Sequence, residues 1–364
     1  MKKLSCIGLC LALILTANAQ EVSYKNRQPY KSWTGLVRTF DDGFYQTKEA
    51  KRIADNVLLY QQTTGGWPKN IYIPAELDKR ERKEVAARKN DVNESTIDNG
   101  ATSTEIYYLA RMYQATQDER YRKGAEDGIQ YLLNAQYPNG GWPQFWPRSE
   151  GYYTEITYND NAMVNVMKLL RSIYEKQPPY SFVADQYITK ARAAFDKGVD
   201  CILKTQVRQN GKLTVWCAQH DHVTLEPIKA RSYELPSLSG SESIGIVLLL
   251  LSLPDPSPAV VTAVESAVAW FEASKIEGLK REYYTTDDGK RDYRMAACAG
   301  CPPLWARFYD LATNQPFFCD RDGIKVPTLD QIGHERRNGY SWYTHDGQKV
   351  LEEYGKWKRQ ATVE

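Results

Sequence analysis

The chain has 364 residues, with 47 Lys and Arg against 45 Asp and Glu, and a formal net charge of +2. This balance argues against a nucleic-acid-binding protein, and 42% hydrophobic residues exclude a disordered chain. The 25 Tyr, 9 Trp and 9 Phe supply flat rings with polar edges, which suit sugar binding and the filling of a core equally well.

Residues 1–19 have the pattern of a secretory signal peptide. Two lysines follow the initial methionine, residues 4–15 are apolar but too short to span a bilayer, and a small-x-small cleavage triplet ends at Ala19. We expect cleavage near Ala19 and a secreted or periplasmic protein. Residues 20–364 contain no linker and predict one domain. The longest later apolar run, residues 244–253, predicts a buried helix, so we expect no membrane partner.

A turn motif recurs about every 70 residues. Predicted helices run into turns at Gly66, Gly141 and Gly211, which are 75 and 70 residues apart, and a faint fourth copy ends at Gly278. The first two turns read Gly-Gly-Trp-Pro, and in the third copy the tryptophan is Trp216. Such a period indicates repeated structural units.

A second amphipathic helix follows each turn. Apolar residues at i, i+3, i+4 and i+7 mark one over residues 106–113, and capping boxes at Thr102–Glu105 and Ser239–Glu242 predict two helix starts. Hairpins of this kind bury their apolar faces by closing into a ring. The predicted fold is all-α, an α/α toroid of repeated helical hairpins with long loops and short β pieces near Tyr283 and residues 340–343.

Two Asp-Asn pairs, Asp98-Asn99 and Asp160-Asn161, precede successive second helices. If the repeats superpose, both carboxylates face one end of the ring. Helix capping is the alternative explanation, and it is weaker for Asp98 because Thr102 already stands where a cap belongs. Two carboxylates at one cleft suit calcium, or the acid and base of an inverting glycoside hydrolase, and spacing does not choose between them.

Arginines form a second group of candidates. Arg231 lies in the loop before the third such helix, where the other repeats have their Asp-Asn pairs; Arg321 lies in an Asp-Arg-Asp-Gly turn, and Arg336 follows soon after. If these guanidinium groups converge with the two carboxylates, they bind an anionic sugar, because their forked donors match a carboxylate.

Five cysteines follow the leader, an odd number that argues against a disulfide scaffold. Cys298 and Cys301 have C-x-x-C spacing, which leaves open a redox pair, half of a zinc site or a local disulfide. Since no second pair stands at metal spacing, we favour a structural role.

Several long segments, in order, resemble the family 10 polysaccharide lyases, which are pectate lyases. The resemblance covers essentially the whole mature sequence and is most specific in residues 65–70, 96–102, 140–144, 158–163, 225–234 and 318–323. It implies an α/α toroid, a calcium cofactor, and cleavage of polygalacturonate or oligogalacturonides by β-elimination. One departure is Cys319, where family members often have glycine before the Asp-Arg-Asp sequence.

The resemblance also implies roles for individual residues. Arg321 matches the arginine base, Arg231 matches the arginine at the substrate carboxylate, and Asp98 and Asp160 match the acidic residues around calcium and substrate. The predicted further sugar contacts are Asn99, Asn161, Arg307 and Arg336. Free arginine has a pKa above about 12, so we expect a nearby cation and partial burial to lower the pKa of Arg321.

Three other functions fit parts of the pattern. The Q-x-x-x-G-x-W repeats at residues 61–67 and 136–142 occur in triterpene cyclases, but no Asp-rich acid motif accompanies them. A hydrolase using Asp98 and Asp160 would release saturated products without calcium. A non-catalytic protein that binds acidic polysaccharides would tolerate Arg321→Ala. We expect the protein to be a monomer.

Overall fold

The structure is a computed structural model that describes residues 32–361, and the predicted signal peptide lies outside them. The longer helices are α2 (Lys48–Tyr60), α3 (Lys79–Ala87), α4 (Ser103–Thr116), α5 (Glu119–Ala135), α6 (Ala162–Tyr174), α7 (Asp185–Thr205), α8 (Glu242–Leu251), α9 (Pro258–Ala273) and α11 (Gly347–Ala361). Two short helices are α1 (Trp33–Val37) and α10 (His334–Asn338). Within the described residues, no helix is long and apolar enough to cross a membrane.

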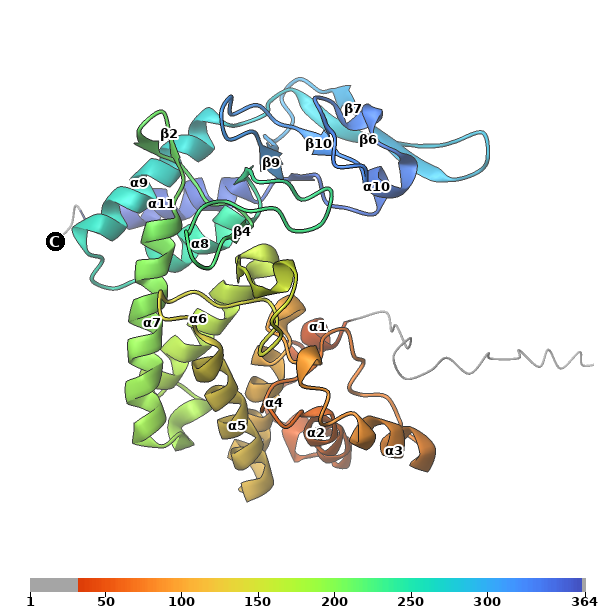
Figure 1. Ribbon diagram of the computed structural model, residues 1–364, viewed down its shortest axis with the longest axis vertical. Coiled ribbons are helices and arrows are strands. Elements are labelled where there is room, and N and C mark those ends of the chain that lie inside the picture. Colours follow the sequence, from red (N-terminus) through yellow and green to blue (C-terminus); the bar gives the residue numbers. More distant parts are fainter. Residues whose placement is uncertain (1–31, 362–364) are drawn as a thin grey trace, which may run out of the picture.

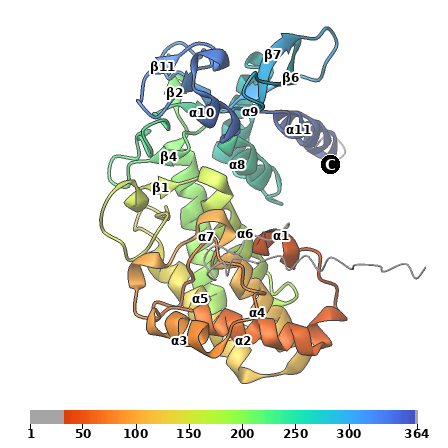
Figure 2. The same ribbon diagram turned by 90° about the vertical axis from the view of Figure 1, so that its right-hand side faces the viewer.

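Most helices form two layers. In the first layer α2 contacts α5, α5 contacts α7, and α7 contacts α9; in the second α4 contacts α6, α6 contacts α8, and α8 contacts α11. The layers are joined because α2 packs on α4, and the hairpins α4–α5 and α6–α7 pack along their length. Figures 1 and 2 show the helices from α1 to α7 below and α8, α9 and α11 above.

The repeat has a common structural basis, a buried tryptophan that ties each turn to the helix before it. Its indole Nε1–H donates to a carbonyl near the end of a first-layer helix, a bond that gives the ring's polar atom a partner inside the core. The pairs are Trp67 to Val57 at 2.7 Å, Trp142 to Leu132 at 2.8 Å, Trp216 to Ile202 at 2.7 Å and Trp305 to Phe271 at 2.9 Å. The tryptophan of the fourth copy is therefore Trp305, which lies beyond Gly278 as Trp216 lies beyond Gly211.

A glutamine in each of the first three turns connects the turn to the next first-layer helix. Gln136 Nε2 donates to the carbonyl oxygens of Gly140, at 3.0 Å, and Ala194, at 2.8 Å; Gln61 and Gln206 bond in the same way. Gly140 has φ +94°, and a Cβ there would lie 1.9 Å from the carbonyl oxygen of Lys197. Both the backbone conformation and the close approach require glycine.

Gly140→Ala is therefore expected to lower the free energy of unfolding by about 3 kcal/mol, since it adds a left-handed conformation and a backbone clash. Gly211→Ala is the control, because Gly211 lies in the third turn with φ +80° and open space around it. That variant should lose only about 1–2 kcal/mol. Urea unfolding measures both, and equal losses would mean that the approach to Lys197 has no cost.

The second-layer helices α4, α6 and α8 begin close together. One-turn 3₁₀ segments, η4 (Asp98–Gly100) and η6 (Asn159–Asn161), precede α4 and α6; η4 contacts η6, and η6 contacts α8. Asn99, Asp160 and Asn161 have φ values of 53°, 52° and 60°, the left-handed region that Asn and Asp tolerate best. These turns carry both Asp-Asn pairs to one end of the helix layer.

Neither predicted capping box forms. Thr102 has φ 64°, and its hydroxyl donates to Thr96 O at 2.8 Å and accepts Trp67 N–H at 3.1 Å, so it anchors the first turn motif instead of capping α4. At α8 only half of the box forms: Ser239 Oγ accepts the Glu242 N–H at 3.0 Å, but the Glu242 carboxylate pairs with Arg307 and does not return to Ser239. In both places, a contact of Thr102 or Glu242 with another part of the fold replaces a bond of the predicted capping box.

The β structure consists of six two-stranded antiparallel pieces, as described for residues 32–361. The pairs are β1 (Ile156–Thr157) with β4 (Gln219–His220), β2 (Arg208–Gln209) with β3 (Lys212–Leu213), β5 (Leu238–Ser239) with β9 (Phe308–Tyr309), β6 (Leu279–Thr285) with β7 (Arg291–Ala297), β8 (Trp305–Ala306) with β12 (Tyr343–Thr344), and β10 (Phe318–Cys319) with β11 (Lys325–Val326). Cys298 and Cys301, just after β7, form a disulfide, which settles the alternatives left open for this pair.

Candidate active site

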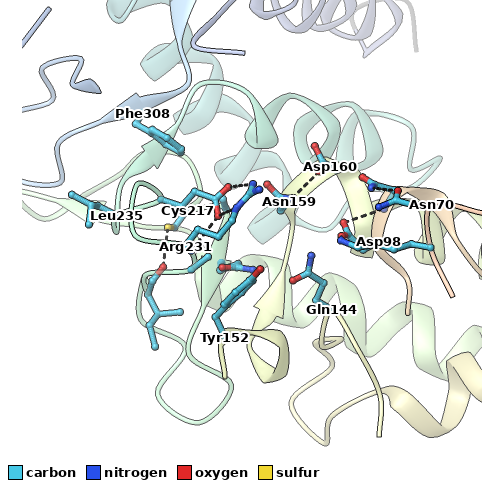
Figure 3. Close-up of a pocket in the computed structure, with 17 residues that line it drawn as sticks. Asn70, Asp98, Gln144, Tyr152, Asn159, Asp160, Cys217, Arg231, Leu235 and Phe308 are labelled. Atoms are coloured by element: carbon cyan, nitrogen blue, oxygen red, sulfur yellow. Dashed lines mark hydrogen bonds and ion pairs between the residues drawn. The ribbon is translucent and has the colours of Figure 1, made fainter. Parts of the chain in front are cut away.

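A cavity of ≈ 210 Å³ lies where the second-layer helices begin. Figure 3 shows Arg231 and Tyr152 on one side, Asp98 and Asn70 on the other, and Asn159 between them. Its lining is mostly polar and comprises Lys69, Asn70, Asp98, Asn99, Gln144, Tyr152, Asn159, Asp160, Cys217, Ala218, Gln219, Ile228, Ala230, Arg231, Glu234, Leu235 and Phe308. The structure thus places Asp98, Asp160 and Arg231 in one cavity.

Asp98 is buried and takes part in tertiary contacts. Its carboxylate pairs with Lys69, and its Oδ1 accepts the Asn99 N–H at 3.0 Å. The Asn99 side-chain amide donates to Asn70 Oδ1 at 2.9 Å, and both residues line the cavity. The carboxylate is bound to Lys69 and to the N–H next to it in η4, whereas helix capping alone would have directed it to the amides of α4.

Asp160 contacts a buried ion pair formed by Glu242 and Arg307. Its side chain is 47% exposed, and its own N–H donates to Glu242 Oε2 at 3.0 Å. Glu242 Oε1 pairs with Arg307, which also donates to Asn159 Oδ1 at 3.2 Å and lies 3.8 Å from Asp160 Oδ1. Burial is the largest single effect and lowers the pKa of Arg307, but the nearby acidic groups, first among them Glu242, together outweigh burial and raise the pKa. Arg307 is therefore a buried cation that helps to position Asn159 and Asp160.

Arg231 is fixed by Glu234. Its Nε donates to Glu234 Oε2 at 2.7 Å and its Nη2 pairs with Oε1, while Tyr340 OH donates to the same Oε1 at 2.8 Å. The bonds from Glu234 raise the pKa of Arg231, so this side chain is a permanent cation. Because two of its three nitrogens are held, the guanidinium faces the cavity in a set orientation.

Arg231, Arg321 and Arg336 surround one buried ring. Their guanidinium carbons lie 4.9, 5.8 and 4.4 Å from the centre of the Tyr233 ring, close enough for cation–π contact. Arg336 is buried and donates to Gly339 O at 3.1 Å. The predicted arginines thus converge, although Arg307, Arg321 and Arg336 do not line the cavity itself.

The expected lowering of the pKa of Arg321 is wrong for this structure. The Arg321 side chain is 63% exposed, and its Nε and Nη2 donate to Glu335 at 3.1 and 3.0 Å. These bonds raise the pKa of Arg321 above its ordinary value. A base needs the opposite shift, so a role as base would require Arg321 to leave Glu335.

The turn that carries Arg321 is well defined despite Cys319. Asp320 Oδ1 and Oδ2 accept the N–H groups of Arg321 and Gly333 at 2.7 and 2.6 Å, and Gly323 N–H donates to Asp320 O at 3.1 Å. Gly323 has φ +79°, and a Cβ there would lie 3.2 Å from Ser232 O, next to Arg231. Backbone contacts therefore link the turn to the loop of Arg231.

A second cavity adjoins the first, and the two together are called the groove. It has a volume of ≈ 550 Å³ and shares Lys69, Asn70, Asn99 and Asp160 with the first cavity, whereas Asn161 lines the second cavity only. Asn161 Oδ1 packs against Gly245, where a Cβ would lie only 1.8 Å away. The two predicted asparagines are therefore separated, with Asn99 between the cavities and Asn161 in the outer one.

The oxygen atoms in this groove are of the types that bind calcium. Asp98 and Asp160 supply carboxylates and Asn70 and Asn99 supply amide oxygens, the hard donors that calcium prefers. Residues 32–361 hold no group of three or more His, Cys, Asp or Glu placed for a metal. An ion here would therefore need further oxygens from substrate and water to complete its shell.

A buried histidine supports the floor of the cavity. His220 Nδ1 lies 2.8 Å from Leu225 O, and its Nε2 accepts Cys217 N–H at 3.2 Å, so the ring is neutral with its proton on Nδ1. Burial lowers the pKa of His220 from 6.5 to about 4. Cys217 and Gln219 beside it line the cavity.

This shift predicts a loss of stability in acid. Below pH 6.5 the unfolded chain binds a proton at His220 that the folded chain excludes until about pH 4, so stability falls as pH falls through this window. The loss attributable to the ring is about 3 kcal/mol. Urea unfolding at several pH values should show a shallower slope for His220→Gln than for the unchanged protein, and identical slopes would contradict the assignment.

Sequence reasoning missed Lys69, Glu234 and Glu242. Lys69 lies in a segment noted for its resemblance but carries no local signal of pairing with Asp98. Glu242 was assigned to a capping box, although its place at the start of a second-layer helix, parallel to the Asp-Asn pairs, was a usable signal. Glu234 stands three residues after Arg231, a spacing that allows the observed pair.

Comparison with known proteins shows the family of this chain. Residues 61–351 match the family model described as pectic acid lyase. A family 10 polysaccharide lyase from Cellvibrio cellulosa is 39% identical, with a TM-score of 0.72, covering 87% of this chain and 95% of that one. A mutant of such a lyase from Cellvibrio cellulosa, in complex with trigalacturonic acid, is 37% identical, with a TM-score of 0.72, covering 89% and 95%. No curated protein matched. Because the family model and both structures span most of the chain, it belongs to the pectic acid lyases of polysaccharide lyase family 10.

Proposed function

We propose that this polysaccharide lyase cleaves α-1,4-linked polygalacturonate by calcium-assisted β-elimination, with Arg321 as the base. The observation that carries the proposal is the meeting of Asp98, Asp160 and Arg231 in one polar cavity beside the arginine cluster. The solved relative in complex with trigalacturonic acid supports the substrate class. Product analysis tests it: ultraviolet-absorbing unsaturated products support elimination, and saturated reducing ends without that absorbance would assign a hydrolase.

The residues have complementary tasks in this reaction. Arg321 removes the proton on C5 of a galacturonate, the C4–O bond to the neighbouring sugar breaks, and a C4–C5 double bond forms while the leaving oxygen takes a proton from water. Arg231 binds the carboxylate attached to C5 and stabilises the negative charge that develops there. Asp98 and Asp160 would hold calcium, which supplies further positive charge at that carboxylate.

The hydrolase alternative is disfavoured by the same geometry. An inverting glycosidase needs one carboxylic acid that stays protonated to donate to the leaving oxygen. Asp98 pairs with Lys69, and the exposed Asp160 carboxylate lies 3.8 Å from Arg307. Each carboxylate therefore already has a cation beside it, an arrangement that suits an electrostatic role.

The calcium part of the proposal predicts a specific defect for Asp160→Ala. This variant should need about tenfold or more calcium for half-maximal activity, since it removes one of two candidate carboxylate ligands. Asp55→Ala is the matched control, because Asp55 has a comparable 44% exposure and an arginine partner, Arg120, but lies on α2. Calcium titration of initial rates after chelation measures both, and an unchanged requirement in Asp160→Ala would remove Asp160 from the ion's ligands.

The remaining sequence expectations belong with this proposal. The contacts within the two helix layers support an α/α toroid, in which α4, α6, α8 and α11 would form the inner helices. Secretion or export to the periplasm rests on the pattern of residues 1–19. An extracellular or periplasmic enzyme would meet a polysaccharide substrate without importing it.

A further inference from the structure

A third cavity lies at the far end of the groove from Arg231. It has a volume of ≈ 330 Å³ and is lined by Thr34, Val37, Arg38, Gly100, Ser103, Thr104, Tyr107, Asn165, Lys168, Leu169, Ser172, Pro178, Pro179 and Tyr180. The second cavity shares Asp160 with the first and shares Arg38 and Asn165 with this one. An open path therefore leads from Asp160 to Arg38, along the region where α1 packs on α4 (Figure 2).

One face of α6 forms the floor of this path. Asn161, Asn165, Lys168 and Ser172 follow one another at spacings of four, three and four residues, which places them on the same side of a helix. Lys168 stands seven residues beyond Asn161, about 10 Å along the helix axis. A polar stripe thus leads out of the candidate active site to Lys168.

The third cavity has a positive charge that no acidic residue of its described lining balances. Its lining includes Arg38 and Lys168 and no Asp or Glu, and neither cation makes an ion pair within residues 32–361. Burial, followed by the charge of Arg38, lowers the pKa of Lys168. The hydroxyl of Ser103 is buried without a partner in the described chain, at the N-terminus of α4, which adds a partial positive charge. These features favour an anion.

We propose that Arg38 and Lys168 form an accessory subsite for a uronate carboxylate of the same polysaccharide chain that occupies the active site. This rests on the proposed function, which supplies a polyanionic chain running through the groove. Tyr107, which is partly exposed, lines the same cavity and offers a ring to the sugar. Arg38 precedes the segment 61–351 that matches the family model, so the subsite is built partly outside the matched region.

The subsite predicts a loss that depends on substrate length. The double variant Arg38→Ala/Lys168→Ala should raise KM for polygalacturonate about three- to tenfold at low salt, with kcat unchanged, because two exposed charge contacts are lost. The shortest oligogalacturonide that the enzyme cleaves should show no change, since it is held around Asp160. The difference should shrink as salt is added.

Lys190→Ala/Lys197→Ala is the matched control, because it removes the same charge from exposed positions on α7. No change with polygalacturonate, an equal change with both substrates, or the same change in the control overturns the proposal. If the enzyme cleaves no polygalacturonate, the proposed function fails separately. Calorimetric binding of polygalacturonate to the unchanged protein and to the double variant then decides, and equal affinities reject the subsite.

Discussion

Arg321→Lys is expected to lower kcat on polygalacturonate by about 10²- to 10⁴-fold while leaving KM within about threefold, because a base acts only as the proton leaves. Lysine keeps the positive charge but cannot place a nitrogen in the same fork. Steady-state kinetics at saturating calcium provide the measurement. Should the variant turn over normally, Arg321 is not the base, and Arg231 or Arg336 becomes the candidate.

Arg294→Lys is the matched control for this change. Arg294 is 67% exposed and pairs with Glu282 on the β6–β7 hairpin, much as Arg321, at 63%, pairs with Glu335. It lies on β7 and does not contact Tyr233 in the structure. An arginine in the same kind of environment but outside the cluster should tolerate the change without loss of kcat.

The ion pair between Arg321 and Glu335 predicts how kcat depends on pH. Glu335 raises the pKa of Arg321 and so opposes its action as a base. In Glu335→Gln the charged form loses its partner and the pKa of Arg321 falls, so kcat should begin to rise at lower pH than in the unchanged enzyme. A shift of the profile to higher pH would show that Glu335 assists the base.

Glu242→Gln is expected to lower the free energy of unfolding by about 3 kcal/mol, since it leaves the buried Arg307 with only the more distant carboxylate of Asp160, 3.8 Å away. Glu242 also accepts the N–H of Asp160, whose left-handed backbone depends on such support. We therefore expect the folded fraction of this variant to lose activity and to need more calcium, which a purely structural role would not produce.

Glu105→Gln is the matched control for Glu242→Gln. Glu105 is the third residue of α4, and burial raises the pKa of both glutamates to about 7. Glu105 accepts from Trp33 Nε1 at 2.8 Å and has no arginine partner in the described chain, so its variant should change stability by about 1 kcal/mol or less. Equal losses in urea unfolding would show that the pair with Arg307 contributes nothing specific.

The repeat was predictable from sequence because its contacts are local. Trp67 and Trp142 each reach a carbonyl ten residues earlier, so turn and helix stay together in the sequence and the pattern is visible. Trp305 bonds to Phe271, 34 residues earlier, because the β6–β7 hairpin intervenes. That insertion separates the fourth tryptophan from its helix in the sequence, so the fourth copy is faint there.

The site was predictable only as far as the repeat reached. Asp98 and Asp160 stand at equivalent turns, so equivalence placed them together without knowledge of their neighbours. Glu242 and Arg307 are 65 residues apart in sequence, so their ion pair could not be predicted from local sequence spacing. The same holds for Arg321, whose expected burial was wrong because exposure and the bond to Glu335 depend on how α10 packs.

The most direct measurement is the mass of the products formed from polygalacturonate in water labelled with heavy oxygen. Elimination does not add water across the cleaved bond, so the account predicts one unsaturated end per cleavage, lighter than a saturated end by one water and free of label from the cleavage itself. Saturated products that carry one heavy oxygen from each cleavage would contradict it.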